Sequence, residues 1–526
     1  MDKVSDTLIF RYNEDQSISS LDPAFIKSQA EIWIAAQIYN GLVDLDSALK
    51  PIPMLAKSWE ISENGLVYKF HLKKGVRFFI QNPEVNLQDR WVTAADVAYS
   101  FGRLVDKATA SPGAWVFSDK ISQKAGEKPF YAENDSTFIL TMSKPFPAIL
   151  ALLATSYCYI VPKELVEKDP VAFGRNPSGT GPFFVKYWEE DVKMVLLKNP
   201  VYFEKENGKQ LPYLQAVNVD FIKNKQTAFM RFVAGEYDFF NGIEGSFKDE
   251  LLSPKATLKP KYRNKFKLLV RPFLNTEYLG FYLDTLKKGK KNVLQNLHLR
   301  KALSFSINRE QIVKYFRNGA GEPGVFGFVP PILQKDGKVP GYNFNIEKAK
   351  EELKLAGFPG GKDCPVFNLT TTADYLDLAV LIKKGWANIG ITVNIDVQTG
   401  GMLRQMRNKG ELQIYRGSWI ADYASAENYM TCFYSKNFSP NGPNYTHYKN
   451  SSFDMQYEKI AFSTQLNESQ NAALEADSLL MSAAPIVVLY YDASIRLIQN
   501  NVHRLSNDAI NRLLLKRVSK TADKRK

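Results

Sequence analysis

The stretch LDLAVLIKKGWANIGITVNIDV, residues 376–397, decides the fold class. Its first part, up to Ile389, has the apolar pattern of a helix, and Gly390 then interrupts that helix. The residues from Ile391 to Val397 alternate strictly between apolar and polar, as in a strand that is buried on one face. A helix that leads directly into a strand is typical of mixed α/β proteins. The sequence therefore predicts an α/β fold.

Further elements extend this pattern toward both ends of the chain. Leu8–Tyr12 is predicted to be a first strand and Pro485–Tyr491 a late apolar strand, while Thr93 and Asn345 each have the spacing of a helix N-cap. A chain of 526 residues is too long for one compact core, so two or three domains are expected. If the first and last strands share a lobe, the chain crosses twice between lobes, which is the arrangement of a hinge.

The charge of the chain gives little indication of a partner. The net charge is +13, but lysine and arginine are dispersed, and the short clusters at Lys287–Lys291 and Lys516–Lys526 lack interleaved aromatic residues. We interpret both clusters as solvated faces, and no nucleic-acid partner is expected. A mildly basic surface would suit an anionic membrane or simple solubility equally well.

No pattern of metal binding or catalysis is evident. The three cysteines (Cys158, Cys364 and Cys432) are widely spaced, which allows one disulfide at most and excludes a zinc site built from cysteines. The four histidines are isolated, and the sequence contains no GxSxG, no GxxxxGK[ST] and no GxGxxG after a strand. We therefore expect no enzyme, no metal and no cofactor.

No segment has the length and character of a membrane span or of a leader peptide. The longest apolar run, Ala148–Val161, is bounded by prolines and too short to cross a bilayer. The first fifteen residues lack the apolar core of a signal peptide. Either the protein is cytosolic, or Met1 replaces a leader that was removed.

The run RNKGELQIYRGSWIADY, residues 407–423, is the strongest candidate for a binding site. It brings together Arg407, Arg416, Trp419, Asp422 and Tyr423 within an otherwise apolar environment. A zwitterion could place its ammonium at Asp422, its carboxylate at an arginine and its apolar body against the aromatic rings. The alternative is a structural ion pair at the end of a strand.

Nine segments, in order along almost the whole chain, resemble one family. They are Ser20–Pro23, Ile38–Leu42, Leu55–Phe78, Thr93–Leu104, Gly179–Phe183, Leu299–Val313, Glu347–Pro359, Trp419–Met430 and Asn441–Ile460. The chain resembles the family 5 extracellular solute-binding proteins of bacterial ABC importers, in particular the dipeptide- and oligopeptide-binding group.

This resemblance implies a periplasmic-binding-protein-like α/β fold with two lobes that close on a peptide and an additional inserted domain. By analogy, lobe I would comprise residues 1–40, 176–265 and 488–526. The inserted domain would comprise residues 41–175, and lobe III residues 266–487.

The resemblance also implies roles for the candidate residues. Asp422 occupies the position of the aspartate that binds the peptide ammonium, and Arg416, six residues earlier, matches an arginine that takes the peptide carboxylate directly or through water. Arg407 matches the second arginine of the family, Trp419 would be a wall of the pocket, and Tyr423 is a further ligand-binding candidate.

Several departures leave the ligand open. The prolines that usually follow the aspartate are absent from residues 424–428, Gly113 replaces a ligand-contacting tyrosine, and a longer loop separates Phe78 from Thr93. A non-peptide solute, such as a nickel chelate, an opine or an oligosaccharide, is one alternative, and a cytosolic enzyme or chaperone is another.

The resemblance implies a peptide ligand, an ABC permease with its ATPase subunits, and a monomeric protein. It further implies a periplasmic or membrane-anchored extracytoplasmic location, with contact to the membrane surface through a removed lipid anchor.

Overall fold

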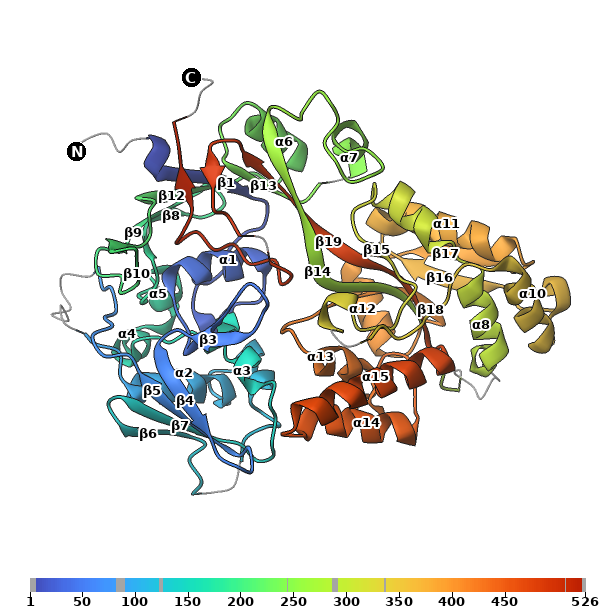
Figure 1. Ribbon diagram of the computed structural model, residues 1–526, viewed down its shortest axis with the longest axis horizontal. Helices are drawn as coiled ribbons and strands as arrows, with labels where there is room; N and C mark the ends of the chain where they lie inside the picture. The colour runs from blue at the N-terminus through green and yellow to red at the C-terminus, as the bar shows by residue number, and fades with distance from the viewer. Residues whose placement is uncertain are drawn as a thin grey trace. The chain divides into compact units, whose positions relative to one another are not determined.

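The computed structural model describes residues 6–81, 90–122, 126–243, 245–285, 292–334, 337–506 and 508–522. The chain forms two compact units (Figure 1). Unit 1 contains residues 1–251, 258–271 and 495–526, and unit 2 contains residues 252–257 and 272–494. The proposed division into three domains at residues 40, 175, 265 and 487 stays a prediction. The expected long loop before Thr93 and the basic cluster at Lys287–Lys291 lie largely outside the described residues.

Unit 1 contains the first strand and the end of the late strand, which extends beyond the predicted Tyr491 to Gln499, while residues 486–494 of that strand belong to unit 2. Its main sheet has the order β19-β13-β1-β12-β9-β8, in which β1 runs parallel to both β12 and β13. The strands are β1 (Ile9–Glu14), β8 (Phe183–Glu189), β9 (Lys193–Lys198), β12 (Ala216–Phe221), β13 (Phe239–Asn241) and the end of β19 (Ile486–Gln499). The helices of unit 1 are α1 (Gln29–Ile38), α2 (Ala94–Val105), α3 (Ile149–Leu152), α4 (Lys163–Lys168), α5 (Pro170–Arg175), α6 (Lys225–Val233) and α7 (Gly245–Leu251).

Helix α1 supplies much of the core on this sheet. Trp33 is almost completely buried and its ring meets that of Phe239 edge to face, with the ring centroids 5.8 Å apart. The helix begins with a capping box in which the Ser28 side chain accepts from the Glu31 amide at 3.3 Å. At the end of α1, Gly179 and Gly181 pack so closely on Ile38 that a Cβ at either position would lie within 2.3 Å of its backbone atoms. The glycine-rich run thus serves close packing.

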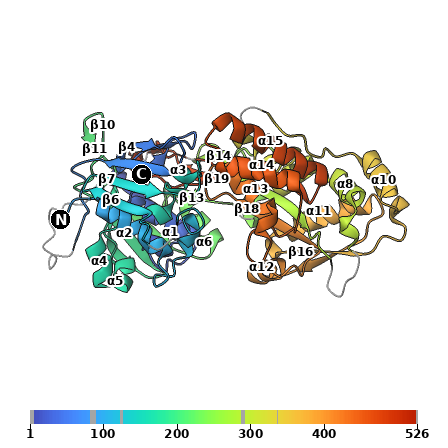
Figure 2. The same ribbon diagram turned by 90° about the horizontal axis from the view of Figure 1, so that it is seen from below.

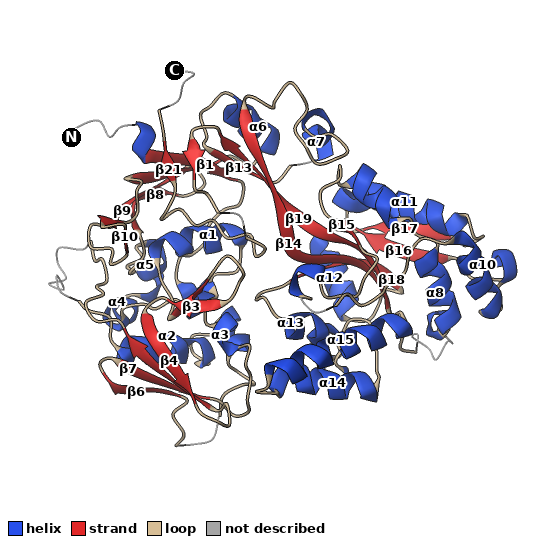
Figure 3. Ribbon diagram, viewed as in Figure 1, coloured by secondary structure: helices blue, strands red, loops and turns tan. Residues whose placement is uncertain are grey.

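A second sheet in unit 1 has the order β4-β5-β7-β6 and lies beside α2 (Figure 3). Its strands are β4 (Ala56–Ile61), β5 (Val67–Leu72), β6 (Phe130–Asn134) and β7 (Thr137–Thr141). The predicted cap at Thr93 is confirmed, because the Asp96 carboxylate accepts from the Thr93 amide at 2.8 Å. Three short two-stranded ladders complete the unit: β2 (Val43–Leu45) with β3 (Pro51–Pro53), β10 (Lys205–Glu206) with β11 (Lys209–Gln210), and β20 (Val502–His503) with β21 (Ser519–Lys520).

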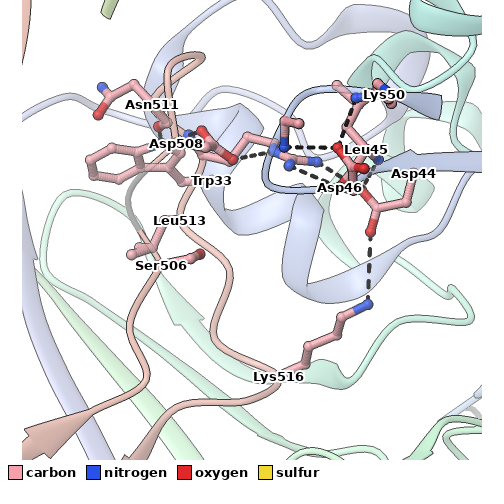
Figure 4. A network of polar contacts seen from close by, with 12 residues as sticks. Trp33, Asp44, Leu45, Asp46, Lys50, Ser506, Asp508, Asn511, Leu513 and Lys516 are labelled. Carbon is pink, nitrogen blue, oxygen red and sulfur yellow. Dashed lines mark hydrogen bonds and ion pairs between the residues drawn. The ribbon is translucent and has the colours of Figure 1, made fainter. Parts of the chain in front are cut away.

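A network of polar contacts holds the C-terminal segment of unit 1 against its N-terminal part (Figure 4). Arg512 donates to Asp508 at 2.6 Å and to Asp44 at 2.7 Å, and Lys516 lies 3.8 Å from the Asp44 carboxylate. The Trp33 indole donates to the carbonyl oxygen of Asn511 at 2.7 Å. The contacts to Asp44 and from Trp33 join residues more than 400 positions apart in sequence and tie the C-terminal segment to the N-terminal part of unit 1.

Unit 2 confirms the predicted helix–strand unit. Helix α11 (Leu376–Ala387) leads into β17 (Val393–Val397), and the sheet has the order β17-β16-β18-β14-β19, with β15 paired to β19. The other strands are β14 (Phe266–Phe281), β15 (Glu322–Pro323), β16 (Phe367–Thr371) and β18 (Ile414–Ile420). The helices are α8 (Leu297–Phe305), α9 (Arg309–Gln311), α10 (Ile346–Leu355), α12 (Gly400–Asn408), α13 (Ala426–Met430), α14 (Ser451–Phe462) and α15 (Leu466–Ala483). The long helices α14 and α15 lie side by side in Figures 1 and 2.

Helix α15 carries a completely buried carboxylate, Asp477. Its oxygens accept from the amides of Phe328 at 2.7 Å and Val329 at 3.2 Å, and from the Gln334 side chain at 2.8 Å. A Cβ at Gly327 would lie 2.0 Å from this carboxylate, so only glycine fits there. Burial raises the pKa of Asp477 to about 7, against the opposing effect of its hydrogen bonds.

The three cysteines are all unpaired in the structure. None of the helices among the described residues combines the length and the apolar character that a membrane crossing requires.

Candidate functional site

Strand β18 positions the run that sequence analysis singled out. It pairs antiparallel with β14, so that Arg416 lies opposite Leu279 and Trp419 opposite Thr276, and it pairs parallel with β16 on its other side. The Ala421 amide still donates to the Leu274 carbonyl at 2.8 Å, which leaves Asp422 as the first residue beyond the paired strand. The run therefore ends where side chains leave an ordered sheet.

Asp422 is exposed to solvent although protein surrounds it on most sides. This crowding raises the pKa of its carboxyl above the ordinary value for aspartate, and a hydrogen bond from Asn428 opposes the rise. Within the part of the chain that the structure describes, no lysine, arginine or histidine forms an ion pair with Asp422. An accessible carboxylate without a protein cation is suited to bind a cation from solution.

Asn428 links Asp422 to the indole of Trp419. The indole Nε1 of Trp419 donates to Asn428 Oδ1 at 3.2 Å, while the Asn428 amide group faces Asp422. Asn428 is 4% exposed on α13, and Trp419 is half-buried. The sequence prediction missed Asn428. It follows Trp419 by nine residues, a spacing that corresponds to no local sequence motif and so did not indicate a contact between the two.

Tyr423 points into the core of unit 2. Its hydroxyl donates to Glu427, whose other carboxylate oxygen accepts from Tyr457 at 2.6 Å. Tyr423 is 4% exposed, and burial raises the pKa of its phenol well above the ordinary value. The geometry favours a supporting role, in which Tyr423 fixes the turn that carries Asp422.

Arg416 has an anionic partner within the protein. Its Nε and Nη2 both donate to one carboxylate oxygen of Glu277, at 2.9 and 2.6 Å, and its guanidinium lies 3.4 Å from the centre of the Tyr375 ring. Glu277 is completely buried, and its other oxygen accepts from Asn275 at 3.0 Å. The structural ion pair considered as an alternative thus exists, but it joins Arg416 to Glu277 rather than to Asp422.

The Arg416–Glu277 ion pair is connected to a second ion pair through Asn275. Asn275 also contacts Asp492 at 3.4 Å, and Asp492 forms an ion pair with Arg317. Ser418 Oγ donates to the amide oxygen of Asn275 at 2.8 Å. The charges of the two ion pairs therefore balance, and Asn275 connects the carboxylate of one pair to that of the other.

Arg407 lies in a different environment, on helix α12. Its guanidinium is 3.9 Å from the centre of the Tyr445 ring and 5.8 Å from that of Tyr415. Its Nε is buried without a hydrogen-bond partner, as is the hydroxyl of Tyr415. Among the described residues no carboxylate pairs with Arg407. The cation is therefore stabilised by ring faces and by a hydrogen bond to Tyr445 rather than by a carboxylate.

Glu277 is the residue of this region that a closer sequence analysis could have found. It is the one charged residue in the apolar stretch LNTEYLGFYL, residues 274–283. A single carboxylate in a strand of this kind is expected to be buried and paired. Its partner could not be identified without the pairing of β14 with β18.

Comparisons with known proteins agree with this architecture. The family described as bacterial extracellular solute-binding proteins, family 5 Middle, matches residues 50–441. The periplasmic oligopeptide-binding protein OppA of Salmonella typhimurium is 28% identical over 516 residues, which cover 93% of this chain and 88% of the relative. Heme-binding protein A of Haemophilus influenzae is 25% identical over 466 residues, which cover 85% of this chain and 80% of the relative.

A solved structure shows the same fold. The ABC transporter-associated periplasmic binding protein DppA from Helicobacter pylori, in complex with the peptide STSA, has a TM-score of 0.75 and 25% identity, and the match covers 97% of this chain and 98% of that one. These relatives are solute-binding proteins rather than enzymes. The chain therefore belongs to the bacterial extracellular solute-binding proteins of family 5, as a substrate-binding protein of the ABC-importer class.

Proposed function

We propose that this protein captures di- to oligopeptides outside the cytoplasmic membrane and delivers them to an ABC permease that is driven by ATPase subunits. The observation that carries the proposal is Asp422, an accessible carboxylate at the end of β18 that has no cationic partner among the described residues. A peptide supplies the missing cation with its α-ammonium group.

Asn428 and Trp419 prepare this site for the ammonium group. The hydrogen bond from Asn428 favours the ionised form of Asp422 and so opposes the rise of its pKa that crowding causes. The half-buried indole beside it offers an apolar wall to the first residue of the peptide. Tyr423 supports this arrangement through Glu427.

Arg407 is the better candidate for the peptide carboxylate. A carboxylate that approached Arg416 would have to compete with Glu277, which already takes two of its donors. Arg407 has no such competitor among the described residues, and its buried Nε lacks an acceptor. Arg416 then acts on the ligand indirectly, through the charge balance behind the site.

A non-peptide solute is the second candidate, because one relative is named as a heme-binding protein. The same carboxylate argues against an anionic solute at this position, since Asp422 would repel it. A neutral or cationic solute would be compatible with Asp422.

The relatives named as periplasmic support a location on the outer side of the cytoplasmic membrane. Attachment to the membrane by a lipid anchor, and a monomeric state, belong to the same proposal.

The proposal is tested by native mass spectrometry of the purified protein followed by calorimetry. Co-purified masses that correspond to peptides are expected, and a mass that fits no peptide would favour the second candidate. In calorimetry, the Asp422→Asn variant is expected to bind a free tripeptide about 30- to several-thousand-fold more weakly, because the substitution leaves the desolvated ammonium unpaired.

The N-acetylated form of the same tripeptide provides the matched control, because it lacks the ammonium group. We expect it to bind the unsubstituted protein and Asp422→Asn with similar, low affinity. If Asp422→Asn weakened both peptides equally, the residue would have a structural role and the ammonium site would be wrong.

A further inference from the structure

One surface segment carries a net positive charge that the peptide site does not use. Residues 258–271, in unit 1, contain six cations and no acidic residue. The cations are Lys259, Lys261, Arg263, Lys265, Lys267 and Arg271, and all six are exposed. We refer to these residues as the basic segment.

Two buried aromatic residues fix the basic segment on the surface. Tyr262 is 4% exposed and Phe266 is 1% exposed, and their rings stack with centroids 5.6 Å apart. Lys261 and Lys265 extend over the Tyr262 ring, at 5.1 and 5.8 Å from its centre. The segment then enters β14 (Figure 1), so its cations stand on an ordered turn and the start of a strand.

Little negative charge in the protein opposes these cations. Glu250 pairs with Lys261 at 2.8 Å. Among the described residues, no carboxylate pairs with any of the other five cations. Where they donate hydrogen bonds they use backbone oxygens, as Lys267 does to Val502 at 3.1 Å and Arg263 does to Leu258 at 3.1 Å. A carbonyl oxygen satisfies a donor without neutralising its charge.

We propose that the basic segment binds the headgroups of an anionic phospholipid membrane. Four of its six cations are lysines, and none of the large apolar side chains exposed in the described part of the protein lies between residues 258 and 271. Protein interfaces are depleted of lysine and enriched in aromatic anchors, and single-stranded nucleic acids need exposed aromatic rings for stacking. A row of flexible point charges without such anchors matches an anionic lipid surface.

The charge of the whole protein acts in the same direction. The net charge is +13, so the protein as a whole is attracted to an anionic surface, and the basic segment determines which face approaches it. Because screening limits this attraction to about 8–10 Å at ordinary ionic strength, the exposed cations nearest the lipid contribute most.

Co-sedimentation of the full chain with lipid vesicles tests the proposal. Vesicles of phosphatidylcholine with about 30% phosphatidylglycerol are compared with vesicles of phosphatidylcholine alone, at about 50 mM and about 500 mM NaCl. We expect binding to the anionic vesicles at low salt, and loss of binding at high salt or without phosphatidylglycerol.

The variant Lys259→Gln/Lys261→Gln/Arg263→Gln/Lys265→Gln is expected to bind the anionic vesicles about tenfold or more weakly. A matched variant removes the same charge elsewhere in unit 1, at four exposed lysines: Lys57, Lys74, Lys128 and Lys186. It should lose much less binding. Both variants should keep the melting temperature and the peptide affinity of the unsubstituted protein, because all eight side chains are exposed.

Equal loss of vesicle binding in the two variants would assign the effect to net charge and overturn the proposal. Absence of vesicle binding, together with binding of soluble poly-glutamate that the first variant abolishes, would show that the segment fits an acidic protein instead. Neither outcome depends on the identity of the peptide ligand.

Discussion

Two carboxylates of unit 2 lie in opposite environments: Glu277 is on β14, and Asp422 follows the neighbouring strand β18. Glu277 is completely buried and paired with Arg416, whereas Asp422 is exposed and has no cation among the described residues. The buried carboxylate thus has a cationic partner within the protein, whereas the exposed one has none among the described residues. Under the proposed function, this difference separates a carboxylate that stabilises the fold from one that binds the ligand, and each can be tested independently.

The largest expected effect concerns Glu277. Replacement by leucine leaves Arg416 with a largely buried, unpaired charge, and we expect the free energy of unfolding to fall by about 3–5 kcal/mol. The double variant Glu277→Leu/Arg416→Met should recover most of this loss, because no charge then remains buried without a partner. Urea denaturation measures both.

Asp422→Asn is the control for this experiment, since an exposed carboxylate should change the free energy of unfolding by less than about 0.5 kcal/mol. If the Glu277 and Asp422 variants lost equal stability, the contrast between the two carboxylates would not hold.

Asp477 extends the comparison to a carboxylate that is buried with hydrogen bonds but pairs with no cation among the described residues. Its pKa is raised to about 7, so the folded state holds a proton that the unfolded state releases near pH 4. Its contribution to stability is therefore complete below the unfolded pKa and is lost as the pH rises through about 7. The expected loss is about 2–4 kcal/mol across this window.

Denaturation at a series of pH values, with Asp477→Asn as the reference, isolates this contribution. The asparagine variant keeps an acceptor for the Phe328 amide and does not titrate. If the free energy of unfolding of both proteins changed with pH in the same way, Asp477 would be shown to remain ionised throughout.

The third prediction contrasts the two arginines of the site. Arg407→Met should reduce the affinity for a peptide with a free carboxylate by about 1.5–3 kcal/mol, the range for a hydrogen bond to a charged group. Calorimetry with the same peptide as its C-terminal amide gives the control, since the amide should bind the variant and the unsubstituted protein alike. A loss confined to Arg416→Met would assign the carboxylate to Arg416 instead.

The smallest effect is the pH dependence of peptide affinity. Ammonium binding needs ionised Asp422, and the pKa of this residue is raised. Affinity should therefore be complete at neutral pH and fall as the pH drops through this raised pKa, earlier than for an ordinary aspartate. The limit is about 1.4 kcal/mol per pH unit. Calorimetry should find no such dependence for Asp422→Asn; a slope that persists in this variant would point to another group.

The local elements of the fold could be predicted from the sequence because their signals lie within a few residues. The helix and strand of residues 376–397 follow from periodicity, and the caps at Thr93 and Asn345 follow from spacing. The family resemblance brought Asp422 and Trp419 into one site. The structure places both of them at the end of β18.

The partner of Arg416 could not be predicted, because it lies 139 residues away. Glu277 is opposite Ser418 in the β14–β18 ladder, so Arg416 is its diagonal neighbour on the same face. Only the register of the two strands determines this contact. The basic segment could not be recognised for a similar reason: Tyr262 and Phe266 interrupt its cations, and only the structure shows that these rings are buried while the cations are exposed.

The distribution of unit 1 over three parts of the chain has a consequence for biosynthesis. Strand β13 needs the end of β19 as its neighbour, so the sheet of unit 1 stays incomplete until residues 495–499 have left the ribosome. Unit 2 is nearly continuous in sequence and has its full set of strands before that point. Because residues 486–494 of β19 belong to unit 2 and directly precede residues 495–499, the sheets of both units are completed late, by the same strand. The free edge of β13 would then stay unpaired until this last segment arrives, while β1, β8, β9 and β12 already have their partners.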